Sequence, residues 1–294
     1  MQFINSYKHL ISLIFVIAFL FFVESFLYKA MSQDQYPSRP PEPEAIWKAN
    51  QAEFEKHIYR NSSGDSLNYR LLKPIQTEVL ADSALPLVVF LHGAGERGIN
   101  NEDQLKWGVW RFALDNMQQE YPAFVVAPQC PADNSWAPFM GENMDPRLAD
   151  QPTQPMQLAI GMVKHIIEKY RIDTTRIYVT GMSMGGMGTW EMLMRRPEWF
   201  AAGAPICGAG DASKKTIKKV AEIPIWLFHG SADKIVNPQF SRKMYKALRE
   251  AGAQPGYTEY PGVNHFSWIP AYRDQQLFKW MFSQQKSKML QDAG

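Results

Sequence analysis

Apolar positions along the chain follow two repeating patterns. Short apolar runs, such as residues 85–91 (LPLVVFL), are typical of strands buried on both faces of a sheet. Longer segments, such as residues 156–170, repeat apolar residues at the spacing of one helix face. These patterns predict strands at 85–91, 123–127, 176–180, 200–207, 223–228 and 257–260, and helices at 101–118 in part, 156–170, 184–195, 212–221, 238–251 and 274–284.

The order of these segments predicts the fold class. Strands that alternate with helices form a mostly parallel central sheet flanked by helices on both faces, so we expect an α/β protein. Ahead of this alternation we expect a helix at residues 45–54 and a hairpin of two strands, 55–60 and 66–72, around the turn 61–65 (NSSGD). In such sheets the chemistry lies at the carboxyl ends of the strands.

The N-terminal region differs in kind from the rest. Residues 10–23 are apolar except for Ser12 and follow Lys8, which suits a signal peptide better than a membrane span of about 20 residues. We therefore expect residues 1–32 to be a signal peptide, with an uncleaved signal anchor as the alternative. The protein is then exported, to the periplasm or the extracellular space. The remaining segments are a proline-rich linker (33–44), one catalytic domain (45–287) and a C-terminal tail (288–294).

The composition limits the kinds of molecule that we expect the protein to bind. With 31 basic and 29 acidic residues the net charge is +2, so we expect no strong attraction to nucleic acid. The basic run at residues 214–219 (KKTIKK) fits the solvated face of a short helix. Two cysteines, Cys130 and Cys207, end different predicted strands, and two buried thiols are a simpler interpretation than a disulfide.

The chemistry centres on residues 178–191 (YVTGMSMGGMGTWE). Within them, residues 181–185 (GMSMG) match the G-x-S-x-G pattern between a predicted strand and a predicted helix. Such a turn is so tight that glycine is needed on both sides of the serine, and it holds the serine in a strained conformation that exposes its hydroxyl. Free N–H groups at the start of the helix favour a developing negative charge. Ser183 is therefore the expected nucleophile.

A serine nucleophile needs a general base and an acid that orients the base. Among the six histidines, His265 follows the last predicted strand in a loop from which imidazole can reach the serine, and it is the expected base. Asp233 follows the strand 223–228 and is the expected acid, with Asp211 as its competitor. The order Ser183, Asp233, His265 is the order found in hydrolases that carry this elbow.

Two backbone N–H groups are expected to form the oxyanion hole. One belongs to Met184, the residue after the nucleophile. The other belongs to Ala94, with Gly95 as the second choice, in a loop of small residues that lets the backbone approach a substrate.

We also predict an ion pair and an aromatic pocket lining near the site. We expect Glu96 and Arg97, in the same loop, to form an ion pair that holds the loop. Trp136, in the long irregular segment 131–155, and Trp268 are the expected aromatic walls of a substrate pocket.

These motifs together resemble serine esterases of the α/β-hydrolase superfamily. The branch concerned includes dienelactone-hydrolase-like enzymes, phospholipase/carboxylesterases, feruloyl and acetyl-xylan esterases, and proteins labelled predicted peptidases. The resemblance covers nearly all of the expected domain, from residues 66–74 to 271–272. Its pieces include 91–98 (LHGAGERG), 127–131 (APQCP), 181–186 (GMSMGG), 205–208 (PICG), 228–233 (FHGSAD) and 260–265 (YPGVNH).

The resemblance implies an α/β-hydrolase that cleaves a carboxylic ester through an acyl-enzyme, with no metal or organic cofactor. Dienelactone hydrolase itself uses a cysteine nucleophile, and Ser183 departs from that chemistry. We expect a serine carboxylesterase acting on small aryl or alkyl esters or on acetyl or feruloyl groups of plant polysaccharide.

Two other functions compete with this one. A serine peptidase of the prolyl-oligopeptidase-like type is the alternative within catalysis, and a non-catalytic binding protein on the hydrolase scaffold is the alternative outside it. Membrane contact is expected only if the N-terminal segment is uncleaved, and the sequence sets no oligomeric state.

Overall fold

The computed structural model describes residues 40–75, 83–138 and 146–286. The expected signal peptide, the tail and residues 33–39 of the linker lie outside these ranges. The described residues from Glu42 onward belong to one compact unit. Within the described ranges, no helix combines the length and the apolar character needed to cross a membrane.

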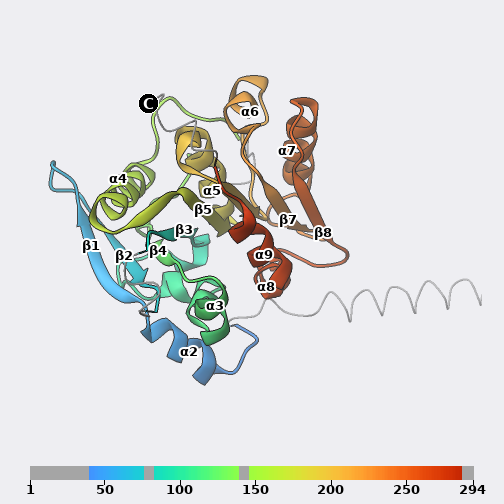
Figure 1. Cartoon of the computed structure of the whole chain (residues 1–294). Helices are drawn as coiled ribbons and strands as arrows, with labels where there is room; N and C mark the ends of the chain where they lie inside the picture. Colours follow the sequence, from blue (N-terminus) through green and yellow to red (C-terminus); the bar gives the residue numbers. More distant parts are fainter. Residues whose placement is uncertain (1–39, 76–82, 139–145, 287–294) are drawn as a thin grey trace, which may run out of the picture. The chain divides into compact units, whose positions relative to one another are not determined.

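A central sheet organises the described residues. Its strands are β1 (Glu55–Arg60), β2 (Ser66–Leu72), β3 (Leu85–Leu91), β4 (Phe124–Pro128), β5 (Ile172–Met182), β6 (Ala202–Ile206), β7 (Trp226–Gly230) and β8 (Gly256–Tyr260). They lie in the order β1-β2-β4-β3-β5-β6-β7-β8 (Figure 1). β1 pairs antiparallel with β2, and β2 pairs antiparallel with β4. Every other pairing is parallel.

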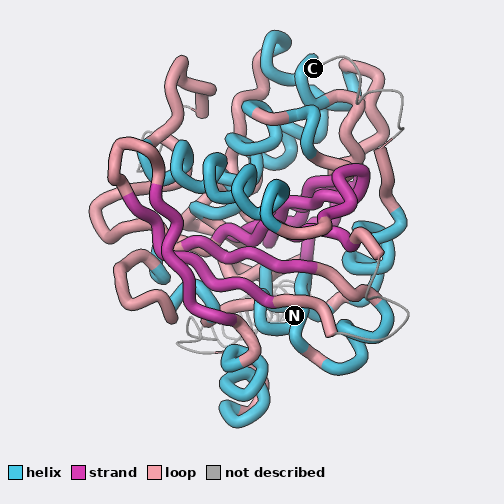
Figure 2. Tube along the Cα trace, turned by 60° about the vertical axis from the view of Figure 1, so that its left-hand side comes forward, coloured by secondary structure: helices cyan, strands magenta, loops and turns pink. Residues whose placement is uncertain are grey.

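Helices cover both faces of this sheet (Figures 1 and 2). They are α2 (Glu44–Ala52), α3 (Asp115–Glu120), α4 (Gln154–Lys169), α5 (Met184–Arg195), α6 (Lys214–Val220), α7 (Gln239–Glu250), α8 (Trp268–Arg273) and α9 (Gln275–Ser283). Short 3₁₀-helices are η1 (Ala94–Glu96), η2 (Asp103–Leu105), η3 (Val109–Ala113) and η4 (Pro197–Trp199). The predicted α/β class with a mostly parallel sheet is confirmed.

The position of strand β3 between two layers of helices explains why its sequence is continuously apolar. Leu87, Val89 and Leu91 pack into a core shared with α4, α5, α6 and α7. Val88 and Phe90 point to the other face and pack into a core shared with η2, η3, α3, α8 and α9. Because successive side chains of a strand point to opposite faces, a strand with helices on both sides must be apolar at every position.

The predicted elements agree with the observed ones with two exceptions. Residues 101–118 form η2, η3 and the start of α3 instead of one longer helix. Gly108 interrupts the segment, because it has a φ of 68° and lies so close to the ring of Tyr272 that a side chain would collide with it. The second exception is α8, which the sequence pattern did not predict.

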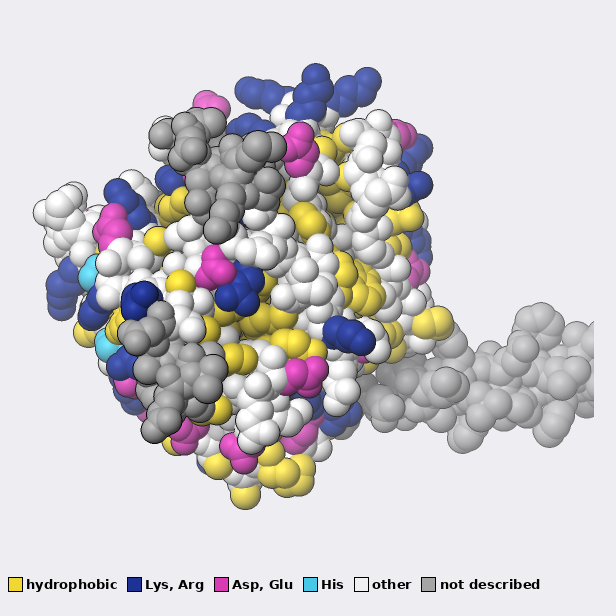
Figure 3. Space-filling model, in the orientation of Figure 1, with side chains coloured by type: hydrophobic (Ala, Val, Ile, Leu, Met, Phe, Trp, Pro, Cys, Tyr) yellow, Lys and Arg dark blue, Asp and Glu magenta, His cyan; other side chains and the backbone are white. Residues whose placement is uncertain are grey.

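Charged side chains are spread over the surface. On the face seen in Figure 3, positive and negative side chains are interspersed, in keeping with the small net charge. The predicted solvated face of the basic run is confirmed: Lys214, Lys215, Lys218 and Lys219 are exposed on α6, while Thr216, Ile217 and Val220 are buried.

Candidate active site

The nucleophile elbow lies between β5 and α5. Ser183 has a φ of 55°, in the left-handed region that non-glycine residues seldom adopt, so the expected strain is present. Its N–H donates to the carbonyl of Ile206 in β6 at 2.9 Å. Ser183 is half-buried, whereas its neighbours Met182 and Met184 are buried. The elbow therefore presents the serine and hides the residues on each side.

The two glycines of the elbow are required by close backbone packing. A Cβ added to Gly181 would lie 2.5 Å from the carbonyl oxygens of Gly185 and Leu91. A Cβ on Gly185 would collide even more closely with the carbonyl of Leu91 in β3. The start of α5 thus lies directly on the carboxyl end of β3, where no side chain fits.

A continuous line of hydrogen bonds joins Ser183, His265 and Asp233. His265 Nε2 lies 2.8 Å from Ser183 Oγ, and His265 Nδ1 lies 2.7 Å from Asp233 Oδ2. Asp233 follows β7 and His265 follows β8, so the parallel sheet brings all three to its carboxyl edge. The structure brings together the three residues that the sequence singled out.

The carboxylate of Asp233 has other hydrogen-bond partners besides His265. Its Oδ1 accepts the N–H groups of Ile235 and Val236, each at 2.9 Å. Its Oδ2 also receives His229 Nε2 at 3.1 Å. Burial by itself raises the pKa of Asp233, but the hydrogen bonds from His229 and His265 outweigh burial and lower it. Asp233 is therefore ionised at neutral pH.

The other candidates for the acid and the base have different partners. Asp211 accepts the N–H groups of Leu148 and Ser213, at 3.0 and 2.8 Å. His229, another of the six histidines, orients the acid. Its Nε2 also faces the carbonyl of Val236 at 2.9 Å, so Nε2 carries the proton and Nδ1 faces the hydroxyl of Ser241. In the sequence, its position four residues before Asp233 could have indicated this role.

The loop after β3, residues 92–97, is here called the oxyanion loop. His92 Nε2 accepts the N–H of Cys130 at 2.9 Å, so the proton lies on Nδ1, which donates to the carbonyl of Gly93 at 2.6 Å. Burial lowers the pKa of His92 to about 4, so the ring stays neutral. Because the peptide is trans, the N–H of Ala94 points away from His92.

This loop lies beside the nucleophile. A Cβ added to Gly93 would be 3.7 Å from the Cβ of Ser183. Arg97 Nε donates to the carbonyl of Ala94 at 2.9 Å, which fixes the next peptide as well. Ala94 belongs to η1 and Met184 is the first residue of α5, so the two N–H groups predicted to form the oxyanion hole come from two different elements.

The expected ion pair between Glu96 and Arg97 is not formed. The guanidinium of Arg97 bonds the carbonyls of Ala94 and Asn134 instead. Glu96 turns into the protein, where its Oε1 accepts Trp107 Nε1–H at 3.0 Å. The prediction was wrong because the guanidinium donates to two carbonyl groups of the surrounding backbone, while the carboxylate, which can only accept, bonds to an indole N–H elsewhere.

Trp136 and Trp268 are packed and do not form open walls. Trp136 is fully buried, donates to the carbonyl of His92 at 3.1 Å, and packs edge-on to the His92 ring. Trp268 is 6% exposed and lies perpendicular to the His265 ring, with centroids 5.3 Å apart. Each ring supports a histidine of the site, and this corrects the expectation that they line a pocket. Residues 139–145 of the segment 131–155 lie outside the described residues.

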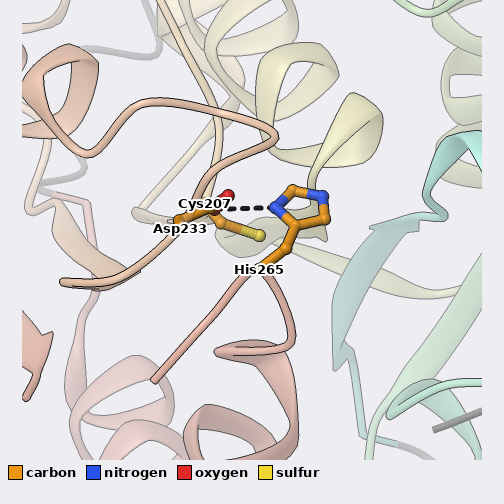
Figure 4. A group of neighbouring side chains, drawn as sticks. All are labelled: Cys207, Asp233 and His265. Atoms are coloured by element: carbon orange, nitrogen blue, oxygen red, sulfur yellow. Dashed lines mark hydrogen bonds and ion pairs between the residues drawn. The ribbon is translucent and has the colours of Figure 1, made fainter. Parts of the chain in front are cut away.

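Cys207 stands behind the acid and the base (Figure 4). Its sulfur, a carboxylate oxygen of Asp233 and a ring nitrogen of His265 lie within 4.8 Å of one another. The donor chemistry does not suit a metal ion, because burial raises the pKa of Cys207 and the Asp233 oxygen already shares a proton with His265. Cys130 and Cys207 are both buried free thiols, as expected.

Known proteins with similar sequences are named as esterases, and solved structures with a similar fold include both esterases and peptidases. The profile of the phospholipase/carboxylesterase family matches residues 75–278. A solved structure of a thermostable esterase is 38% identical with a TM-score of 0.75, covering 81% of this chain and 64% of that one. A probable carboxylesterase of Arabidopsis thaliana is 26% identical over 195 residues, which are 62% of this chain and 73% of that protein.

A further relative is much longer than this chain. The bifunctional acetylxylan esterase/xylanase of Neocallimastix patriciarum is 28% identical over 129 residues, which are 41% of this chain and 19% of that enzyme. The match to the family profile covers more than half of the chain and includes Ser183, Asp233 and His265. The chain therefore belongs to the phospholipase/carboxylesterase family and has the α/β-hydrolase fold.

Proposed function

We propose that this protein is a serine carboxylesterase that works through an acyl-enzyme. One observation carries the proposal: the line of hydrogen bonds from Ser183 Oγ through His265 to Asp233, with distances of 2.8 and 2.7 Å. A serine hydroxyl is a poor nucleophile until a base takes its proton, and this geometry places a base at the hydroxyl. The family supports an ester as the bond that is cleaved.

In the first half of the reaction, Ser183 Oγ attacks the ester carbonyl carbon while His265 Nε2 takes the hydroxyl proton. The N–H groups of Ala94 and Met184 stabilise the negative charge on the former carbonyl oxygen. The bond to the leaving oxygen then breaks, and His265 gives its proton to the departing alcohol. Asp233 stays ionised and stabilises the imidazolium in between.

In the second half, a water molecule attacks the acyl-enzyme. His265 Nε2 takes a proton from the water, and the same two N–H groups stabilise the second tetrahedral intermediate. The bond between Ser183 Oγ and the acyl carbon breaks, and His265 returns the proton to the serine. The products are a carboxylic acid and an alcohol, and the enzyme is regenerated.

The substrate class is an acyl ester of a small alcohol or of plant polysaccharide, with acetyl and feruloyl groups as the acyl parts. Support for acetyl comes from the relative named as a bifunctional acetylxylan esterase/xylanase. Export to the periplasm or the extracellular space is part of the proposal, because polysaccharide esters lie outside the cell. A mature N-terminus near Gln33 in mass spectrometry supports export with cleavage, and an intact N-terminus contradicts it.

The test compares wild type with Ser183→Ala on p-nitrophenyl acetate, butyrate and octanoate. We expect the variant to lose roughly 10³- to 10⁶-fold in kcat/KM, because the nucleophile is gone while the fold is kept. Ser283→Ala is the matched control, since Ser283 is exposed in α9 and should leave the rate unchanged. Equal activity of Ser183→Ala and wild type contradicts the proposed nucleophile.

The same protein separates the competing functions. If acetyl- and feruloyl-xylan fragments are cleaved faster than short peptides, the esterase is supported over the peptidase, and the reverse order overturns it. A fluorophosphonate probe should label Ser183 in wild type only. A well-folded wild type that is neither labelled nor active indicates the binding protein.

A further inference from the structure

We propose that Glu96 is a positioning residue that joins the oxyanion loop to the general base through Trp107, so that one buried carboxyl group aligns both halves of the active site. The proposal rests on the serine esterase mechanism proposed above. It concerns a residue that touches neither the triad nor the substrate and acts through other groups.

The carboxyl group of Glu96 is attached to the oxyanion loop at one side. The N–H of Gly93 bonds to it, and its Oε2 lies 3.0 Å from the position that a Cβ on Gly93 would take. Gly93 is also the residue whose carbonyl bonds to His92. Glu96 therefore fixes the peptide that precedes Gly93, while His92 fixes the peptide that carries the Ala94 N–H.

At its other side the carboxyl group holds Trp107. Its Oε1 accepts the indole N–H at 3.0 Å. The Trp107 ring packs edge-on to the rings of Phe266 and Trp268, each with centroids 5.9 Å apart. Trp268 in turn lies perpendicular to the ring of His265. A packed row thus runs from Glu96 through two indoles to the general base.

An ionisable group is a costly way to satisfy an indole N–H in a protein interior. Glu96 is 5% exposed, and a neutral glutamine could accept the same hydrogen bond without the desolvation of a charge. The carboxylate differs from the amide in one respect: it has an acceptor oxygen on each side, whereas the amide has an acceptor on one side and a donor on the other. That difference is what ties Gly93 and Trp107 to the same side chain.

The surroundings of Glu96 make both protonation states accessible near neutral pH. Burial raises the pKa of Glu96 to about 7, against the opposing effects of Trp107, Lys106 and the Gly93 N–H, while Asp103 raises it further. The neighbouring Arg97 faces the carbonyls of Ala94 and Asn134. The ionised form accepts both N–H groups with charge-assisted bonds, and protonation converts one acceptor oxygen to a donor.

The test uses Glu96→Gln and Trp107→Phe, alone and combined, with p-nitrophenyl acetate as substrate. The amide of Glu96→Gln can accept one N–H but sets an NH₂ against the other, and Trp107→Phe keeps an aromatic ring but removes the indole N–H. We expect each variant to lose about 10-fold in kcat with little change in KM, as for one hydrogen bond to a charged group. The double variant should lose about as much as the worse single variant, because both break the same connection between Gly93 and Trp107.

Matched controls come from the same segment. Trp110→Phe removes a buried indole whose N–H has no partner among the described residues, and Glu102→Gln removes an exposed acid. Both should keep kcat within about twofold once circular dichroism shows that they are folded. If Glu96→Gln does not fold, Trp107→Phe gives the same comparison from the other end of the bond.

The pH profile separates positioning from a purely structural role. Protonation of Glu96 removes the same acceptor oxygen that Glu96→Gln removes, so log(kcat/KM) of wild type should fall by about one unit more than that of the variant as pH is lowered through 7. The ratio of the two rates should therefore shrink from about 10 above pH 7 to about 1 below it. Unchanged kcat with an unchanged acid limb, or fully additive losses in the double variant, overturns the proposal. If Ser183→Ala is inert while Glu96→Gln matches wild type, only this inference fails and the esterase stands.

Discussion

The two sides of the active site are built by different means. On the nucleophile side, Ser183 is positioned by backbone packing: a strained φ, a hydrogen bond from its own N–H, and a glycine pressed against Leu91. On the acid–base side, Asp233 and His265 sit on loops and are positioned by side chains, chiefly His229 and Trp268.

The difference shows where each side tolerates change. Backbone groups that are already in contact leave no room for another atom, so the elbow accepts no added carbon atom. A network of hydrogen bonds can lose one member and keep the others, at the cost of that bond. We therefore expect added carbon atoms at the elbow to act through the fold, and the loss of a hydrogen bond on the acid–base side to act through the rate.

Gly185→Ala should have the largest effect on the nucleophile side. The added Cβ collides with the carbonyl of Leu91, so β3 and α5 must separate. We expect the free energy of unfolding in urea to fall by about 3 kcal/mol or more, together with a loss of activity. Gly252→Ala is the control, because Gly252 has a φ of 91° but open space around it, and should cost only about 1 kcal/mol. Equal costs for the two variants contradict the steric account.

His229→Ala should act on the acid–base side through the rate. Without the Nε2–H, Asp233 loses one of its four hydrogen bonds, and the carboxylate orients His265 less well. We expect kcat/KM to fall roughly 10- to 100-fold, the value of one hydrogen bond to a charged group.

The matched variant for this side is His229→Gln. Its amide N–H can stand in for Nε2–H, so it should recover part of the rate that His229→Ala loses. Steady-state kinetics on p-nitrophenyl acetate measures both. Rates within twofold of wild type for His229→Ala indicate that the loop of Asp233 is held by its backbone bonds alone.

Glu96 connects the oxyanion loop on the nucleophile side to the general base. Of the changes considered, its ionisation should have the smallest effect, and that effect is on stability. The folded pKa is about 7 and the unfolded value is 4.5, so the folded state binds more protons between these values. The contribution of Glu96 to stability is therefore greatest below about pH 4.5 and declines as pH rises through 7. We expect the Tm of Glu96→Gln relative to wild type to increase across this window. A constant difference in Tm from pH 4.5 to 7.5 contradicts a raised pKa.

Much of the fold followed from local patterns in the sequence. The apolar run of β3 and the helical spacing of α4 gave elements with nearly the observed bounds, because both depend on which faces are buried. Residues 101–118 and α8 were harder, because Gly108 and the packing of Tyr272 decide them, and these two residues are far apart along the chain.

The candidate site also has parts that the sequence predicted and parts that it did not. The positions of Ser183, Asp233 and His265 at strand ends were predictable, since a parallel sheet brings its carboxyl ends to one edge. The partners of Glu96 and Trp136 were not, because each bonds to a group on another segment, whereas the role of His229 could have been found from its position four residues before Asp233. A side chain's choice among several buried donors depends on distances that no local pattern contains.

The sequence by itself determined the fold class, the nucleophile elbow and the order of the triad, because hydrophobic periodicity, the five-residue elbow pattern and the positions of strand ends can all be read along the chain. Only the tertiary structure decided that Glu96 turns inward to Trp107, that Arg97 satisfies the loop carbonyls, and that both tryptophans support histidines. Those outcomes are set by which buried polar groups meet across the fold, since most buried polar groups are hydrogen-bonded in a folded protein.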